Sequence, residues 1–453
     1  METQHKTPEQ PAGTVTRRQA LKYAGAGVVG AAGIWFGLKH TLLKDYFSNT
    51  GGHSLQPVTT RIDPRTGAAI SLLAFGCMRL PLLEQGKPDI DEPRAMEMID
   101  YAYRHGVNYF DTAWFYHQGM SETFIGKALQ RYPRETFYLA DKMPGRLIES
   151  LDHAKEVFAE QLKKCRVDYF DFYLLHSVGK VEDYEQVYED YGVYNYLTEE
   201  KAKGRIRRLG FSFHGHRNDF PYFAGKHDWD FAMIQANYLD WDIDGAYLYN
   251  ELAQRNIPCL IMEPVRGGML ATLNPDAVKI LKTADARRST ASWAFRWIAS
   301  QPNVLTVLSG MSNMEHVKDN VKTMTGFEPM TGEEYAAVAN ALAAFQRVKP
   351  VPCTECEYCM PCPANVNIPL VFKTYNKCVS ESNVPDLNAS RNNDFRKKRR
   401  TFLALMNNFI PEKERAARCI GCNHCLPLCP QRIAITDKMH EISDLIKSLQ
   451  FKS

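Results

Sequence analysis

The sequence lacks both a charge imbalance and a long basic tract of the kind that binds nucleic acid. Its 55 Lys and Arg residues nearly balance its 52 Asp and Glu residues, which leaves a formal net charge of +3. No long basic run interleaves with aromatic residues, so the composition gives no support to nucleic-acid binding. At 453 residues the chain is too long for one ordinary domain, and we expect two or three units with at least one large core.

Long hydrophobic runs are also scarce. The apolar run "YAGAGVVGAAGIWFGL" at 23–38 is short for a membrane-spanning helix, which needs about twenty strongly apolar residues. Paired Arg17 and Arg18 precede it in "TRRQALK", and the combination resembles a twin-arginine export signal, which a receptor reads as an address. We therefore expect a signal over 1–38 and a polar linker over 39–58. The protein would be exported, and periplasmic or membrane-anchored facing the periplasm.

Two alternatives to a cleaved signal stay open. The segment could be an ordinary N-terminal helix with a chance Arg pair. No convincing A-x-A cleavage site follows it, so an uncleaved signal could also hold the protein at the membrane. That is the only membrane association that the sequence suggests.

Cysteine is nearly absent before residue 352 and concentrated after it. Cys77, Cys165, Cys259 and Cys378 are scattered, whereas the other eight of the twelve fall in two runs. Cysteines separated by only two residues cannot all form disulfide bonds that connect distant segments of the chain. The clustering therefore indicates metal sites.

Between about residues 59 and 345, short β-rich runs alternate with amphipathic helical segments. The expected strands are 70–76, 107–111, 136–142, 169–176, 205–212, 231–237, 258–263 and 304–310. Eight strands separated by helices predict an α/β fold, a (β/α)8 TIM barrel. In that fold the chemistry belongs at the C-terminal ends of the strands.

Four polar residues stand at or just beyond the ends of the second, third and fourth expected strands: Asp111, Tyr116, Lys142 and His176. With "YFDTAWFYHQGMSETFIGKAL" and "WAFRWIASQPNVLTVLSGMSNMEHVKDN", they resemble the aldo-keto reductase superfamily over nearly all of 59–345. The resemblance implies that Tyr116 is the general acid and that Lys142 lowers its pKa. Asp111 would balance Lys142, and His176 would orient the substrate oxygen.

The resemblance also implies that the protein binds a nicotinamide nucleotide. NADP(H) is the usual cofactor of the family, and NAD(H) is the alternative. In the family, a Ser-Asn pair and a Gln grip the nicotinamide carboxamide; here Ser212 and Gln235 match, but Phe213 replaces the Asn. Ser312 stands where a basic residue often binds the 2′-phosphate. The remaining expected nucleotide contacts are Arg266, Gly310, Asn313 and Asn320. For Ser312 and Asn313, an ordinary loop role is the alternative.

The two cysteine runs share a spacing, in which the first three cysteines are separated by two residues and the last precedes a proline. This spacing predicts two [4Fe-4S] clusters. The ligands would be Cys353, Cys356, Cys359 and Cys362 in the first run and Cys419, Cys422, Cys425 and Cys429 in the second. In two-cluster ferredoxins, the cysteine before proline ligates the other cluster, so Cys429 should join the first group and Cys362 the second. The first run is one residue short, which makes Cys362 the weakest candidate. Two zinc sites are the alternative, but zinc ribbons usually combine two separated C-x2-C pairs.

We expect 346–453 to form a mostly α-helical dicluster ferredoxin-like domain, because the residues between the runs are charged and amphipathic. Its "RKKRR" segment indicates a solvated helix face, with docking to an acidic electron carrier as the alternative.

The whole chain resembles an iron-sulfur branch of the aldo-keto reductases. We expect it to interconvert a small-molecule carbonyl and an alcohol by hydride transfer, with the clusters relaying electrons to or from a redox partner protein. The alternative is an electron-transfer protein that keeps the barrel as a scaffold. The expected pocket-shaping residues are Phe75, Met78, Arg79, Trp114 and the "HGHRND" loop.

Overall fold

The computed structural model describes residues 56–84, 87–346 and 350–450. The predicted twin-arginine signal and most of the predicted linker lie outside these residues. No helix in the described part of the chain is long and apolar enough to cross a membrane.

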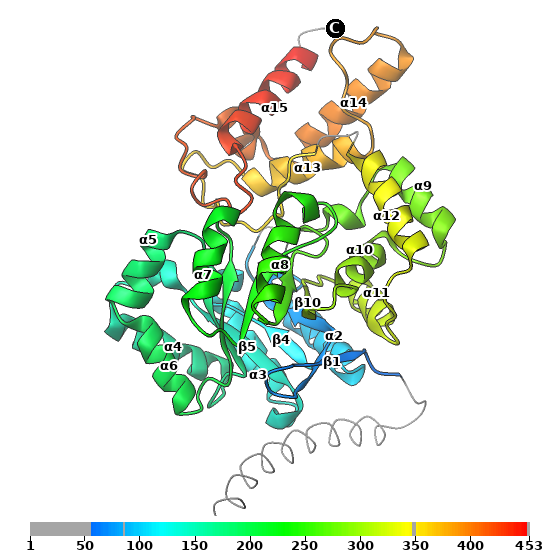
Figure 1. Cartoon of the computed structure of the whole chain (residues 1–453). Coiled ribbons are helices and arrows are strands. Elements are labelled where there is room, and N and C mark those ends of the chain that lie inside the picture. Colours follow the sequence, from blue (N-terminus) through cyan, green and yellow to red (C-terminus); the bar gives the residue numbers. More distant parts are fainter. Residues whose placement is uncertain (1–55, 85–86, 347–349, 451–453) are drawn as a thin grey trace, which may run out of the picture.

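Eight parallel strands close into a barrel, which confirms the predicted (β/α)8 fold (Figure 1). They follow one another around the barrel in chain order, and β10 pairs with β3 to close it. The strands are β3 (Leu73–Gly76), β4 (Tyr109–Asp111), β5 (Tyr138–Met143), β6 (Phe172–Val178), β7 (Leu209–Phe213), β8 (Phe231–Gln235), β9 (Cys259–Met262) and β10 (Val304–Ser309).

The first expected strand is divided in the structure. Residues 69–71 form β2 (Ala69–Ser71), which pairs with β1 (Thr60–Ile62) in a separate antiparallel hairpin, and the barrel strand begins at Leu73. Ala68 and Ile70 belong to the same buried cluster as the barrel residues Tyr109, Phe172 and Phe231. The hairpin therefore adds apolar side chains to the barrel interior.

Helices surround the barrel because their apolar faces pack against the outer side of the strands. Local signals fix their ends: Ser150 caps α4, and Thr331 and Glu334 form a reciprocal capping box at the start of α12. The helices of this part are α2 (Glu92–Arg104), α3 (Met120–Leu129), α4 (Leu151–Cys165), α5 (Val181–Tyr184), α6 (Val193–Ala202), α7 (Phe220–Lys226), α8 (Ala246–Gln254), α9 (Pro275–Ala284), α10 (Thr290–Ala299), α11 (Met314–Met324) and α12 (Gly332–Phe345).

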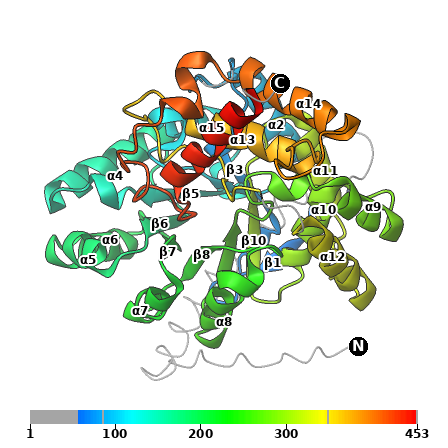
Figure 2. The same cartoon turned by 90° about the horizontal axis from the view of Figure 1, so that it is seen from above.

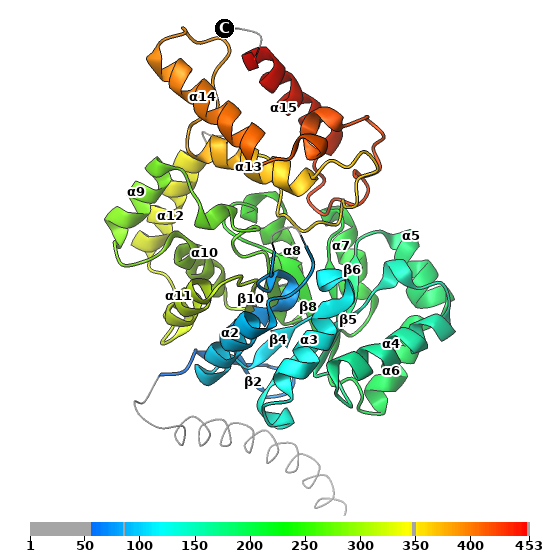
Figure 3. The same cartoon turned by 180° about the vertical axis from the view of Figure 1, so that it is seen from behind.

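The C-terminal part is mostly helical, as expected, and has a hydrophobic core of its own. It contains α13 (Ile368–Ser380), α14 (Asn393–Asn408) and α15 (Ile435–Gln450). The first cysteine run lies on the loop before α13, and the second lies on the loop between α14 and α15. Seen from above and from behind, these helices lie across one end of the barrel (Figures 2 and 3). The domain boundary near residue 346 stays a prediction.

Candidate active site

The four side chains expected at the strand ends lie together. Asp111 ends β4, Lys142 lies in β5 and His176 in β6, and these strands pair in that order. Tyr116 begins the short helix η2 (Tyr116–Gly119), just after β4. All four line one cavity at the C-terminal ends of the strands.

Lys142 is the centre of this group. Its ammonium donates hydrogen bonds to Asp111 Oδ1 at 2.5 Å, to the Thr112 carbonyl at 2.6 Å and to Tyr116 Oη at 3.3 Å. A lysine has three N–H donors, so all of them are used. The contacts therefore fix the ammonium beside the Tyr116 hydroxyl.

Tyr116 differs from expectation in its ionisation. Burial raises its pKa well above the ordinary value, and the nearby charge of Asp111 raises it further. The predicted lowering by Lys142 does not prevail, because Asp111 compensates the ammonium charge and burial disfavours a phenolate. Tyr116 is therefore a neutral hydroxyl near pH 7, which is the form that can donate a proton.

His176 is also neutral. Burial lowers its pKa well below the ordinary value, and the positive charge of Lys142 lowers it further. Its ring meets the Tyr116 ring edge to face, with centroids 6.1 Å apart. A neutral imidazole beside the phenol can hydrogen-bond a substrate oxygen without competing for the Tyr116 proton.

The cavity has a volume of about 340 Å³, and both parts of the chain supply its walls. Met78, Arg79 and His214 line it as expected, whereas Phe75 is in the core and the Trp114 ring packs against Lys164. Glu263 and a set from the C-terminal part were not predicted. That set is Thr354, Glu355, Cys356, Tyr358, Lys373, Pro430 and Gln431.

The expected nucleotide residues are divided between two environments. Ser212, Gly310, Ser312 and Asn320 line the cavity. Asn313 instead caps α11, where its side-chain oxygen accepts a hydrogen bond from the His316 N–H at 2.9 Å. Asn313 therefore has an ordinary structural role as a helix cap, which was the alternative to nucleotide binding.

Gln235 and Arg266 are bound by protein groups. Gln235 exchanges two amide hydrogen bonds with Gln431, at 2.8 and 3.1 Å, and donates to Asp240 at 2.9 Å. Arg266 forms a buried ion pair with the same Asp240. The Ser212 hydroxyl accepts the Ser177 N–H at 2.8 Å, and Phe213 packs on Phe220. Gln235 and Arg266 therefore already have protein partners, whereas Ser212 also faces the cavity.

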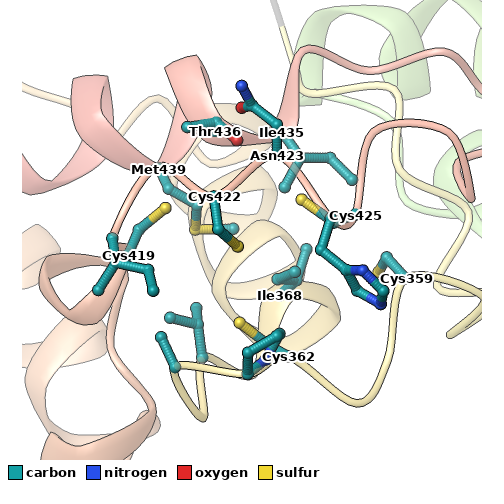
Figure 4. A pocket seen from close by; sticks show the side chains of 15 residues that line it. Cys359, Cys362, Ile368, Cys419, Cys422, Asn423, Cys425, Ile435, Thr436 and Met439 are labelled. Carbon is teal, nitrogen blue, oxygen red and sulfur yellow. The ribbon is translucent and has the colours of Figure 1, made fainter.

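The cysteines form two groups that draw on both runs. Cys362, Cys419, Cys422 and Cys425 surround one space beside α13, and Cys359 also lines it (Figure 4). Cys353, Cys356, Cys359 and Cys429 lie close enough that their thiolates would repel one another. This is the crossed grouping expected from the sequence, although the ligand assignment stays a prediction.

The surroundings of the Cys362 group fit an iron-sulfur cluster. Apolar side chains, including Ile368, Ile435 and Met439, share the lining with the cysteines. In the described part of the chain, no three His, Cys, Asp or Glu side chains converge closely enough to hold a single metal ion. In the other group, the Glu355 N–H donates to Cys353 Sγ at 3.4 Å, the kind of contact that tunes a cluster.

Comparison with known proteins agrees with both parts. The Aldo/keto reductase family matches residues 72–343, and a 4Fe-4S dicluster domain matches residues 352–434. The latter match supports iron-sulfur clusters rather than the zinc sites left open by the sequence.

Relatives and solved structures resemble the barrel part. The chain is 25% identical to the NADH-specific methylglyoxal reductase of Escherichia coli, over 52% of this chain and 84% of that protein. It is 24% identical to the L-galactose dehydrogenase of Arabidopsis thaliana, over 63% of this chain and 93% of that protein. An aldo-keto reductase from Bacillus halodurans, solved in its holo form, superimposes with a TM-score of 0.52 at 25% identity, covering 63% of this chain and 96% of that one.

The family match spans more than half of the chain and includes the strands that bring Asp111, Lys142 and His176 together. This protein is an oxidoreductase that belongs to the aldo/keto reductase family and carries a C-terminal 4Fe-4S dicluster domain.

Proposed function

We propose that the protein interconverts a carbonyl and an alcohol in the cavity at the barrel mouth and relays the electrons to or from a redox partner through two [4Fe-4S] clusters. One observation carries this proposal. Cys356, from the first cysteine run, lines the same cavity as Tyr116, Lys142 and His176. The expected cluster ligand and the expected proton donor thus share one cavity.

The residues of the barrel supply the proton chemistry. Converting a carbonyl to an alcohol takes two electrons and two protons, and one of those protons goes to the oxygen. Tyr116 is positioned to give that proton, and in the reverse direction its conjugate base takes it back. Lys142, held by Asp111, stabilises the phenolate that forms when the proton leaves. Neutral His176 orients the substrate oxygen.

The cysteine loops supply the electron chemistry. When bound, each cluster would normally carry one electron, so two clusters match the pair that a carbonyl needs. The loop at 353–359 reaches the cavity, and the Cys362 group lies farther along the domain beside α13. Of the eight expected ligands only Cys356 lines the cavity, so the group that contains it would be the one nearer the substrate.

The names of the relatives support the substrate class. By their names, a methylglyoxal reductase reduces a small carbonyl compound and an L-galactose dehydrogenase oxidises a sugar. We infer a small carbonyl or alcohol as the substrate of this protein also.

The scaffold alternative is disfavoured by the buried ion pair. Placing Lys142 and Asp111 almost wholly out of water costs desolvation energy that an apolar pair would avoid. A barrel kept only as a scaffold gains nothing from this arrangement.

The proposal is tested with Tyr116→Phe in protein whose clusters have been reduced chemically. We expect carbonyl substrates to reoxidise the clusters of the native protein, and the substitution to slow this by about 10²–10⁴-fold, because the proton donor is lost. The cluster absorbance measures the rate, and a panel of small aldehydes, ketones and sugars supplies the substrates. Tyr132→Phe is the matched control, because its hydroxyl bonds Asp100 outside the cavity.

Two results would count against the proposal. A near-native rate in Tyr116→Phe would remove the proton-donor role. Clusters that remain reduced with every member of the panel would favour the scaffold alternative.

Export by the twin-arginine route is a further part of the proposal and rests on the sequence alone. It suits the domain organisation, because a protein with a folded iron-sulfur domain must receive its clusters before it crosses a membrane.

A further inference from the structure

The Gln235 side chain has its hydrogen-bonding capacity taken up by the protein itself. Its amide nitrogen donates to Gln431 and to Asp240, and its carbonyl oxygen accepts from Gln431. The Gln235–Gln431 contact is a reciprocal amide pair across the two domains. Gln431 presents a primary carboxamide, the same group that nicotinamide carries.

The neighbouring polar groups are engaged in the same way. The Ser212 hydroxyl already accepts the Ser177 N–H, and Phe213, in place of the expected amide, is buried among aromatic rings. Arg266 forms an ion pair with Asp240, whose carboxylate also accepts a hydrogen bond from the Gln235 amide. A nicotinamide carboxamide arriving at Gln235 would have to displace its two hydrogen bonds with Gln431.

The backbone of the cluster domain also lies close against the barrel loops. A Cβ atom added to Gly267 would come within 2.5 Å of the Thr354 backbone, so the two segments are in direct contact. Arg79 donates to the carbonyls of Thr354 and Glu355, and its side chain packs on Gly310. The first cysteine loop thus crosses the end of the cavity where Gly267 and Gly310 lie.

We propose that Gln431 is a built-in substitute for the nicotinamide carboxamide, and that the barrel does not accept a nicotinamide nucleotide while the cluster domain is docked. The inference rests on the proposed function. With the nucleotide excluded, the redox partner supplies both electrons through the clusters, Tyr116 gives one proton to the substrate oxygen, and solvent supplies the second proton, which goes to the substrate carbon. The cavity of about 340 Å³ is then left to the substrate, with Tyr116 and His176 on the barrel side and Cys356 and Tyr358 on the other.

Calorimetric titration of the cluster-loaded protein with NADPH and with NADH tests the inference. We expect no saturable binding by the native protein up to millimolar nucleotide. Gln431→Gly should bind at least about tenfold more tightly than the native protein, since two amide hydrogen bonds no longer compete. Adding Gln235→Ala to that variant should abolish the gain. The cluster absorbance spectrum shows that each variant retains its folded C-terminal domain.

Arg432→Ala is the control, because Arg432 follows Gln431 and holds Asp244 at the rim of the same contact. It should titrate like the native protein. Saturable micromolar binding by the native protein that Gln235→Ala weakens would overturn the inference. A Gln431→Gly variant that gains no binding would also overturn it.

The outcomes separate this inference from the proposed function. If the native protein binds a nucleotide and reduces a carbonyl with it, the inference fails and the carbonyl chemistry of the proposed function stands. If Tyr116→Phe keeps its rate, the proposed function fails, and the titration still decides whether the nucleotide is excluded.

Discussion

Lys142 and Asp111 form an ion pair whose side chains are each 2% exposed. Removing one partner from such a pair leaves a charge buried without compensation, whereas removing both charges relieves the desolvation cost. Two opposing effects act on the pKa of Asp111: burial raises it, and the contact with Lys142 lowers it. The pair serves the site, since the ammonium also contacts Tyr116.

We therefore predict that Lys142→Met lowers the free energy of unfolding by about 3–5 kcal/mol. Combining it with Asp111→Asn should recover a large part of that loss, because no charge remains buried. Neither variant should turn over a carbonyl substrate. Anaerobic urea unfolding followed by circular dichroism measures the stabilities. Equal stability of the single and double variants would show that the two charges are not coupled.

The two histidines of the cavity make stability depend on pH. Burial lowers the pKa of His176 well below 6.5, and burial lowers the pKa of His214 to about 4. In the unfolded chain both would titrate near 6.5. Between pH 6.5 and the lower folded values, the unfolded state binds more protons than the folded state. Acid therefore favours unfolding in that window, and the effect disappears above pH 6.5.

We predict that His214→Gln reduces the loss of stability between pH 7.5 and pH 5. The lowered pKa of His214 corresponds to about 2 kcal/mol at pH 5, which the variant should no longer lose. Urea unfolding of native and variant protein at both pH values measures this difference. Parallel stability curves for the two proteins would show that His214 is not the titrating group. At pH 7.5 the substitution should act only through its packing.

At the scale of elements, α13 separates cysteines of different roles. Cys362 lies on the loop before this helix and faces the space shared with Cys419, Cys422 and Cys425. Cys378 lies within the helix and is buried in the apolar core of the C-terminal part. Spacing alone left Cys362 the weakest candidate ligand, and the position of its loop strengthens the case for it.

Iron analysis of Cys362→Ser and Cys378→Ser distinguishes a ligand from a core residue. Native protein made anaerobically should contain about eight iron atoms per chain, and Cys378→Ser should retain them. Cys362→Ser should lose about four, or hold one cluster so weakly that it is lost on purification. Stoichiometric zinc without iron in the native protein would contradict the cluster assignment.

Over the whole molecule, the features predicted correctly from the sequence are those that a local residue pattern determines. The barrel strands are short apolar runs, and Asp111, Lys142 and His176 follow from their strand ends. The split at Leu72 was missed, because a strand and a hairpin arm that adjoin in sequence share one apolar pattern. The contacts of Gln235 with Gln431 and of Arg79 with Thr354 join residues about 200 or more positions apart. They depend on how two domains dock, which no local pattern encodes.

We propose that export of the whole molecule depends on the paired Arg17 and Arg18. Replacing both with Lys keeps the charge but removes the planar guanidinium groups that the export receptor is expected to read. We expect the variant to accumulate in the cytoplasm, folded and loaded with iron, while the native protein reaches the periplasm. Immunoblots of the two fractions, with iron analysis of each, measure this. Equal periplasmic amounts would mean that the Arg pair is incidental, whereas a misfolded variant would show itself by missing iron. Because free NAD(P)H is not expected to be regenerated outside the cytoplasm, export would also explain why a barrel of this family gains from a cluster domain docked against its nucleotide residues.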